Sequence, residues 1–253
     1  MTFSEPVPTY EGDLNEHEPI PDGYDWRTRD LASEPLDLMV EDNTSPSLVI
    51  SFGGCGINPD TGESMYAMVN LLRDEEVSKV YLRDQFGSWM LNGIRGFSVD
   101  VASTVTALRK VIDGLNPSWV TATGGSGGGY AAILYGTLLG ADRVFAINPQ
   151  TLLQPGVQCF AHGGLYRLKW TNPADWAYHD LLNLPVTDTP IEIAHGSGES
   201  VDRFHSGRMG ERAGVTLLPF KGTHGQLAPD MRDHGILAEM VMSLGNAQCT
   251  WLT

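Results

Sequence analysis

Cysteine is scarce in this sequence. Its 253 residues include three cysteines, Cys55, Cys159 and Cys249, which lie far apart along the chain. A small, odd-numbered set of this kind forms neither a disulfide framework nor the closely spaced ligands of a zinc site. No two of the seven histidines have the His-x-x-x-His spacing of metal ligands on one helix. The sequence therefore predicts a reducing compartment and no metal or cofactor.

Positive charge and long apolar runs are also in short supply. The sequence has 16 Lys and Arg residues against 31 Asp and Glu residues, so its formal net charge is −15. Nucleic-acid backbones and anionic membranes attract basic surfaces, and neither is expected as a partner. No stretch is long and apolar enough for a transmembrane helix, and residues 1–6 lack the features of a signal peptide. We therefore expect a cytoplasmic protein.

Apolar residues are plentiful and are grouped in an alternating pattern. Hydrophobic residues make up 42% of the chain, which is enough for a large core. Stretches rich in β-branched and aromatic residues predict strands at residues 36–40, 47–52, 79–83, 118–123, 143–149, 190–196 and 215–220. Helices are predicted at residues 65–72, 99–113, 130–139 and 230–244. This alternation predicts an α/β fold with a mostly parallel sheet flanked by helices on both faces.

Two segments do not follow this alternation. Residues 1–35 are polar and rich in Pro, Glu and Asp, so we expect an N-terminal arm beside a single domain at residues 36–253. Residues 152–189 carry aromatic side chains among polar residues and prolines. A segment of this length between two strands is typical of a lid insertion over a pocket. Helices packed against the sheet edge are the alternative.

A glycine-rich stretch between a predicted strand and a predicted helix carries the main chemical signal. Gly124-x-Ser126-x-Gly128 matches the nucleophile elbow, in which small neighbours let a strained turn lift a serine hydroxyl above the sheet. A phosphate-binding loop would need Lys and then Ser or Thr after the glycines, where Tyr130 and Ala131 stand. A dinucleotide-binding fingerprint would need glycine at the position of Tyr130. We therefore predict that Ser126 is a nucleophile.

A second glycine turn directly follows the predicted strand at residues 47–52. Backbone N–H groups at Gly54 or Cys55, together with that of Gly127, would form an oxyanion hole, because glycine lets a substrate approach the backbone closely. A tight turn without any ligand is the alternative. The elbow downstream favours the oxyanion hole.

A nucleophilic serine needs a base, and the base needs a third group that orients it. His224 follows the predicted strand at residues 215–220 and is the candidate base. Two acids lie in the predicted loop after the strand at residues 190–196: Asp202, which we favour because aspartate is the commoner partner, and Glu199, the alternative acid. His195 is expected to be structural. The remaining histidines considered lack a matching partner and are expected on the surface or in the lid: His162, His179, His205 and His234.

A loop of polar and aromatic residues follows the predicted strand at residues 79–83. Ligands bind at the carboxyl ends of strands in open α/β sheets, so Gln85 and Trp89 are candidate substrate-binding residues. The alternative is a loop in which Trp89 fills the edge of the core.

These features together resemble the α/β-hydrolase superfamily over about residues 45–245. The motifs that carry the resemblance are the elbow around Ser126, Phe52-Gly53-Gly54, His195-Gly196 and Gly222-Thr223-His224-Gly225. More narrowly, residues 81–89, 126–132 and 148–151 resemble a small bacterial subgroup whose members often occur beside polysaccharide functions. Gly127 departs from many relatives, which carry a larger residue after the serine.

The resemblance implies a serine hydrolase that cleaves a carboxylic ester through an acyl-enzyme. The order serine, acid, histidine is the order of the catalytic partners in this superfamily. The substrate would be a small-molecule or saccharide ester. An acyltransferase that uses the same residues on a sugar or amine acceptor is one alternative. A catalytically inactive binding or scaffold protein with this fold is the other.

Overall fold

The computed structural model describes residues 30–54, 65–154 and 173–243. All three cysteines lie outside these residues, and so does most of the expected arm at residues 1–35. The arm therefore stays a prediction. In the part of the chain that the structure describes, no helix is long and apolar enough to cross a lipid bilayer.

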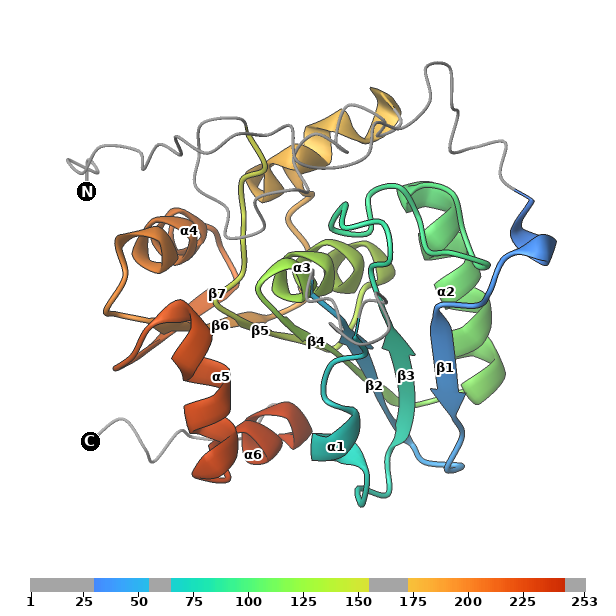
Figure 1. Ribbon diagram of the computed structural model, residues 1–253, viewed down its shortest axis with the longest axis horizontal. Coiled ribbons are helices and arrows are strands. Elements are labelled where there is room, and N and C mark those ends of the chain that lie inside the picture. Colours follow the sequence, from blue (N-terminus) through green and yellow to red (C-terminus); the bar gives the residue numbers. More distant parts are fainter. Residues whose placement is uncertain (1–29, 55–64, 155–172, 244–253) are drawn as a thin grey trace.

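The described residues form a seven-stranded sheet with the strand order β1-β3-β2-β4-β5-β6-β7 (Figure 1). The strands are β1 (Leu38–Glu41), β2 (Ser47–Phe52), β3 (Ser78–Leu82), β4 (Trp119–Gly125), β5 (Arg143–Ile147), β6 (Ile191–Gly196) and β7 (Val215–Phe220). β1 runs antiparallel to β3, and all the other neighbouring pairs are parallel. The prediction of a mostly parallel sheet is confirmed.

Helices cover both faces of the sheet, as the sequence predicted. They are α1 (Val69–Leu72), α2 (Val101–Leu115), α3 (Gly127–Leu139), α4 (Ser200–Gly210), α5 (His224–Asp233) and α6 (Ile236–Met242). One core cluster contains buried residues of α2, α3 and α4, and a second contains buried residues of α1, α5 and α6. In Figure 1, α5, α6 and α1 accordingly lie together at one side of the ribbon. The sheet separates the two clusters.

The side chains of β2 alternate between the two faces of the sheet, so this strand contributes to both core clusters. Leu48, Ile50 and Phe52 pack into the cluster with α2 and α3, whereas Val49 packs into the cluster with α1, α5 and α6. Successive strand residues point to opposite faces, so a strand buried on both sides is mostly apolar and does not alternate. In β2 the run Leu48, Val49 and Ile50 is apolar, and this run made its position readable from the sequence.

Helix α3 is buried along most of its length and lies close to the sheet. A Cβ atom at Gly136 would lie 2.5 Å from a methyl carbon of Val144 on β5, so this position must lack a side chain. The close packing fixes the start of α3 relative to the end of β4. The turn between these two elements is the predicted elbow.

The structure corrects the sequence-based assignment of the C-terminal elements. The single helix predicted at residues 230–244 is two helices, α5 and α6, with a break at Gly235, whose φ is 74°. Helix α4 was not predicted, because residues 200–210 mix polar side chains with two glycines and lack an apolar period of 3.6. Asp202 and His224 therefore lie on helices, in the first turn of α4 and at the start of α5, and not in loops.

The described residues of the expected lid are 152–154 and 173–189, and those at 173–184 pack on the domain. This stretch forms two 3-10 helices, η4 (Pro173–His179) and η5 (Leu181–Asn183). The Tyr130 hydroxyl of α3 donates a hydrogen bond to the Tyr178 carbonyl (2.5 Å), and Arg208 of α4 forms an ion pair with Asp180 (2.8 Å). Residues 155–172 lie outside the described residues, so the lid itself stays a prediction.

Candidate active site

Ser126 stands on a strained turn between β4 and α3. Its φ of 54° and ψ of −119° are unusual for a residue with a side chain. The turn needs glycine on both sides: a Cβ atom at Gly124 would lie 2.4 Å from the Gly128 carbonyl oxygen, and one at Gly128 would lie 2.2 Å from the Phe52 carbonyl oxygen. This close backbone approach is the physical reason for the Gly-x-Ser-x-Gly spacing.

His224, the first residue of α5, bridges the serine and an acid. Its Nε2 atom lies 3.0 Å from Ser126 Oγ, and its Nδ1 atom lies 2.7 Å from Asp202 Oδ1. An ionised carboxylate accepts hydrogen bonds only, so Nδ1–H donates to Asp202 and Nε2 is left to accept the proton of the Ser126 hydroxyl. The structure thus places the three predicted residues in one hydrogen-bonded series, which we call the Ser–His–Asp series.

The two candidate acids occupy different positions around His224. The Asp202 side chain is 2% exposed and contacts the imidazole ring. Glu199 is half-buried, and its Oε1 atom accepts a hydrogen bond from the backbone N–H of His224 at 3.3 Å. Only a group at the ring orients the imidazole, whereas a group at the backbone fixes the start of α5. The geometry therefore gives the two acids separate tasks.

Asn148 ties this arrangement together from the end of β5. It is buried and adopts a φ of 42°, a left-handed conformation that asparagine tolerates better than most residues. Its Oδ1 atom accepts a hydrogen bond from the Gly196 N–H (2.8 Å), and its Nδ2 group donates to the His224 carbonyl (3.2 Å). In the sequence, Asn148 stands out only as part of the stretch at residues 148–151 and has no predicted role. Asparagine before proline at a strand end was the available signal.

The glycine turn after β2 lies against the start of α3. A Cβ atom at Gly54 would be 3.6 Å from the Gly128 nitrogen and 3.9 Å from the Gly127 nitrogen. The first N–H groups of a helix have no partner within the helix, and Ser126 makes no side-chain capping bond to α3. The predicted oxyanion residues Gly54 and Gly127 are thus close together, while Cys55 lies outside the described residues.

Comparisons with known proteins were made on both sequence and structure. No family model and no curated protein matches the sequence. Among solved structures, an α/β-hydrolase enzyme from a Medee basin deep-sea metagenome library superposes with a TM-score of 0.53 at 11% identity, over 82% of this chain and 94% of that one.

The chain has the α/β-hydrolase fold. Two further structures agree. A carboxylesterase from the thaumarchaeon Nitrososphaera gargenis matches with a TM-score of 0.52 at 14% identity, over 82% of this chain and 95% of that one. The capsule O-acetyltransferase of Neisseria meningitidis serogroup A matches with a TM-score of 0.55 at 12% identity, over 81% and 90%. At these identities the likeness establishes the fold.

The two substrate-binding candidates lie after β3 in this α/β-hydrolase fold. Trp89 is fully buried in the cluster with α2 and α3, and its indole N–H donates a hydrogen bond to Gln150 Oε1. This position agrees with the alternative expectation, a tryptophan that fills the edge of the core. Gln85 is half-buried in the turn at residues 84–87. It stays a candidate.

The expectation that His205 lies on the surface or in a lid is wrong. His205 is buried on α4, and its Nδ1 atom accepts a hydrogen bond from the backbone N–H of Thr151 at 3.0 Å. It therefore joins α4 to the chain beyond β5, one helical turn after Asp202. Sequence reasoning missed this because α4 was not predicted.

His195 is buried near the end of β6, and burial lowers its pKa below the usual value.

Proposed function

We propose that the chain is a serine hydrolase that cleaves a carboxylic ester through an acyl-enzyme. The observation that carries this proposal is the Ser–His–Asp series, with 3.0 Å between Ser126 Oγ and His224 Nε2 and 2.7 Å between His224 Nδ1 and Asp202 Oδ1. A nucleophile within hydrogen-bond reach of a base, itself oriented by a buried acid, is the arrangement that activates a hydroxyl. The α/β-hydrolase fold places such a serine at the same strand-to-helix turn.

The reaction follows from these positions. Ser126 Oγ attacks the ester carbonyl carbon while its proton moves to His224 Nε2, and Asp202 stabilises the imidazolium that forms. The carbonyl oxygen becomes an oxyanion, for which the N–H of Gly127 and one from Gly54 or Cys55 are the proposed donors. One such donor contributes about 3 kcal/mol to the transition state. His224 then protonates the alcohol as the C–O bond breaks, and water releases the acid by the reverse sequence.

Transfer of the acyl group to a hydroxyl acceptor is the second candidate function. It uses the same acyl-enzyme, which the acceptor attacks in place of water. Its support is the shared fold with the meningococcal capsule O-acetyltransferase, which superposes about as well (TM-score 0.55) as the Nitrososphaera carboxylesterase (0.52). The two functions differ only in what attacks the acyl-enzyme, so product analysis separates them.

The test is the turnover of p-nitrophenyl acetate and butyrate by the wild-type chain and by Ser126→Ala. We expect turnover in the wild type and, in the variant, a loss of about 10⁴-fold or more in kcat. A fluorophosphonate probe should label the wild type and not the variant. If the folded wild type neither turns over an ester nor reacts with the probe, the catalytic proposal fails and a binding protein with this fold replaces it. Adding a sugar acceptor and identifying the products then separates transfer from hydrolysis.

A further inference from the structure

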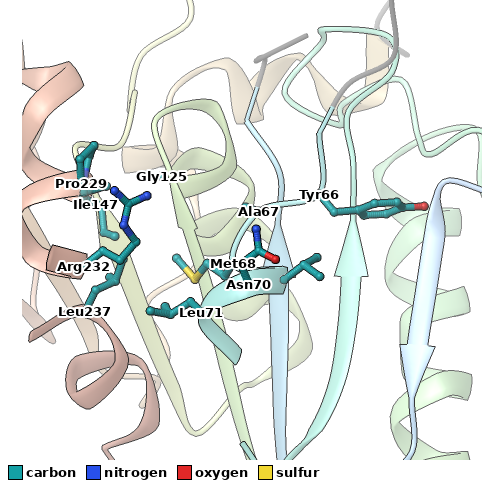
Figure 2. Close-up of a pocket in the computed structure, with 12 residues that line it drawn as sticks. Tyr66, Ala67, Met68, Asn70, Leu71, Gly125, Ile147, Pro229, Arg232 and Leu237 are labelled. Carbon is teal, nitrogen blue, oxygen red and sulfur yellow. The ribbon is translucent and has the colours of Figure 1, made fainter. Parts of the chain in front are cut away.

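A pocket of about 350 Å³ opens between α1 and the pair formed by α5 and α6. It is lined by residues that precede and form α1, by the last residues of β4 and β5, and by residues of α5 and α6. Figure 2 shows Met68 and Leu71 on one side of it and Arg232 and Leu237 on the other. Its volume lies in the lower part of the range of small-molecule sites.

Two elements that carry or directly precede residues of the Ser–His–Asp series also line this pocket. On the strand side it is lined by Gly125, the residue directly before Ser126. On the helix side it is lined by Ala228 and Arg232, which follow His224 at intervals of four residues along α5. Residues four apart share one face of a helix, so the pocket runs along the face of α5 that begins at His224. The pocket therefore lies next to the turn that carries Ser126.

The residues that line the pocket favour an uncharged group of a substrate. Met68, Leu71, Ile147 and Leu237 supply apolar side chains, and the thioether of Met68 accepts a weak hydrogen bond from the Thr123 hydroxyl on β4 (3.8 Å), which helps to hold it in place. The one charged residue of the lining, Arg232, is exposed, and its guanidinium forms an ion pair with Asp233 at 2.9 Å. An alkyl or aryl group gains from burial there, while a carboxylate would have to compete with Asp233.

Unlike Gly124 and Gly128, Gly125 has room for a side chain, so the geometry of the turn does not require glycine there. Gly124 and Gly128 lack room for a side chain, but a Cβ atom at Gly125 would meet only the Ile147 carbonyl oxygen, at an ordinary 3.8 Å. Its φ also lies outside the left-handed region that favours glycine. The backbone would therefore accept a side chain at Gly125. Since Gly125 lines the pocket, a side chain there would occupy the space next to the nucleophile.

We propose that this pocket binds an apolar alkyl or aryl group of the ester that Ser126 attacks, and that Gly125 keeps it open at the nucleophile. This inference rests on the proposed hydrolase function and adds the substrate class to it. The bound group belongs to either the acyl or the alcohol part of the ester, and the two arms of the test distinguish these. A buried methylene favours binding by about 0.8 kcal/mol, or about fourfold in kcat/KM.

The experiment measures chain-length selectivity in two ester series. The acyl series is p-nitrophenyl acetate, butyrate and hexanoate, and the alcohol series is ethyl, butyl and hexyl acetate. Gly125→Val fills the pocket from β4 and Ala228→Leu fills it from α5. The matched controls make the same changes at exposed positions of α2, where Gly114 has no neighbour within 4 Å: Gly114→Val and Ala102→Leu.

We expect the wild type to prefer the longest ester in one series. In that series we compare kcat/KM of the longest ester with kcat/KM of the shortest. Both filled variants should lower this ratio about tenfold or more, and the control variants should keep the wild-type ratio. A change in the acyl series assigns the pocket to the acyl part, and a change in the alcohol series assigns it to the alcohol part. If both filled variants turn over esters with wild-type ratios in both series, the pocket proposal is overturned while the hydrolase proposal stands.

A binding measurement separates this inference from the hydrolase proposal. Ser126→Ala is titrated with 1-hexanol and with hexanoic acid by calorimetry, alone and combined with Ala228→Leu. Binding that the added leucine weakens about tenfold or more supports the pocket even if the wild type hydrolyses no ester. Absence of binding together with absence of turnover overturns both proposals.

Discussion

At the scale of single residues, the Asn148 side chain links three elements that surround the Ser–His–Asp series. One amide side chain joins the ends of β5 and β6 to the start of α5, where His224 stands. Small displacements of a catalytic group cost orders of magnitude in rate. Under the proposed hydrolase function, we therefore expect Asn148 to act as a positioning residue, which fixes the backbone of His224 without touching the substrate.

Asn148→Ala should lower kcat for p-nitrophenyl acetate about 10- to 100-fold and leave KM nearly unchanged. It should also lower the free energy of unfolding by about 1–3 kcal/mol, because the buried Gly196 N–H loses its acceptor. Asn148→Gly is the control, since glycine adopts the φ of 42° without strain yet lacks the amide. Wild-type kcat in Asn148→Gly would show that the side chain does not position His224.

The division of tasks between the two acids is also decided by single substitutions. Asp202→Asn should lower kcat about 10⁴-fold, because an amide at the imidazole favours the wrong tautomer. Glu199→Gln keeps an acceptor for the His224 N–H and should cost less than about tenfold. Steady-state kinetics on p-nitrophenyl acetate compares the two variants directly. The reverse order of effects would make Glu199 the catalytic acid.

At the scale of elements, close backbone contacts between β2, β4 and α3 hold the elbow in its conformation. Gly128→Ala would bring a Cβ atom to 2.2 Å from the Phe52 carbonyl oxygen, so β2 and α3 would have to separate. We expect a loss of at least about 2 kcal/mol in the free energy of unfolding, measured by urea denaturation. Gly114→Ala, in the exposed part of α2, should instead stabilise by up to about 1 kcal/mol. Equal effects of the two substitutions would contradict the packing of the elbow.

Helix η4 carries a buried carboxyl whose charge opposes folding. Asp175 accepts a hydrogen bond from the Val101 N–H at the start of α2 (3.2 Å), and burial raises its pKa from 3.8 to about 6. Because the folded state holds the proton more tightly than the unfolded state, this group makes stability fall as the pH rises from about 4 to about 6.

Asp175→Asn keeps an acceptor for the Val101 N–H and removes the titration. The free energy of unfolding of the variant minus that of the wild type should therefore increase when the pH is raised from 4 to 7. Urea unfolding of both proteins at the two pH values measures this difference. A difference that is constant or that shrinks with rising pH would contradict the assignment of a raised pKa to Asp175.

The elements differ in how far the sequence determines them. β2 and β5 were predicted to within two residues because strands buried on both faces contain apolar runs, here residues 48–50 and 144–147, a signal that needs no tertiary information. Helix α4 carries no such signal, since its packing depends on β6 and β7 and not on an apolar stripe. Chain order and spacing to the strands still singled out Ser126, Asp202 and His224, the three residues that the structure joins in one hydrogen-bonded series. The burial of Trp89 and His205 could not be found in this way, as both depend on partners distant in sequence.

At the scale of the whole molecule, the formal net charge of −15 opposes compactness. Raising the NaCl concentration from about 0.01 M to about 0.15 M shortens the screening length from about 30 Å to about 8 Å. The melting temperature should therefore rise over this range, as scanning calorimetry would measure. Salt also weakens attractive ion pairs, which would lower the melting temperature. The buried ion pair of Asp37 with Arg83 (2.7 Å) is screened less than surface charges, so this opposing effect should be small. A flat or falling melting temperature would count against self-repulsion.

The strand order has a consequence for synthesis on the ribosome. The sheet extends from β4 in one direction by β5, β6 and β7, whose spatial order is also their order of translation. Ser126 emerges near the middle of the chain, but Asp202 follows β6 and His224 follows β7. A nascent chain therefore contains Ser126 before His224 has been translated. Ser126 gains this hydrogen-bond partner only in a nearly finished fold, so under the proposed mechanism partly made chains carry no activated nucleophile.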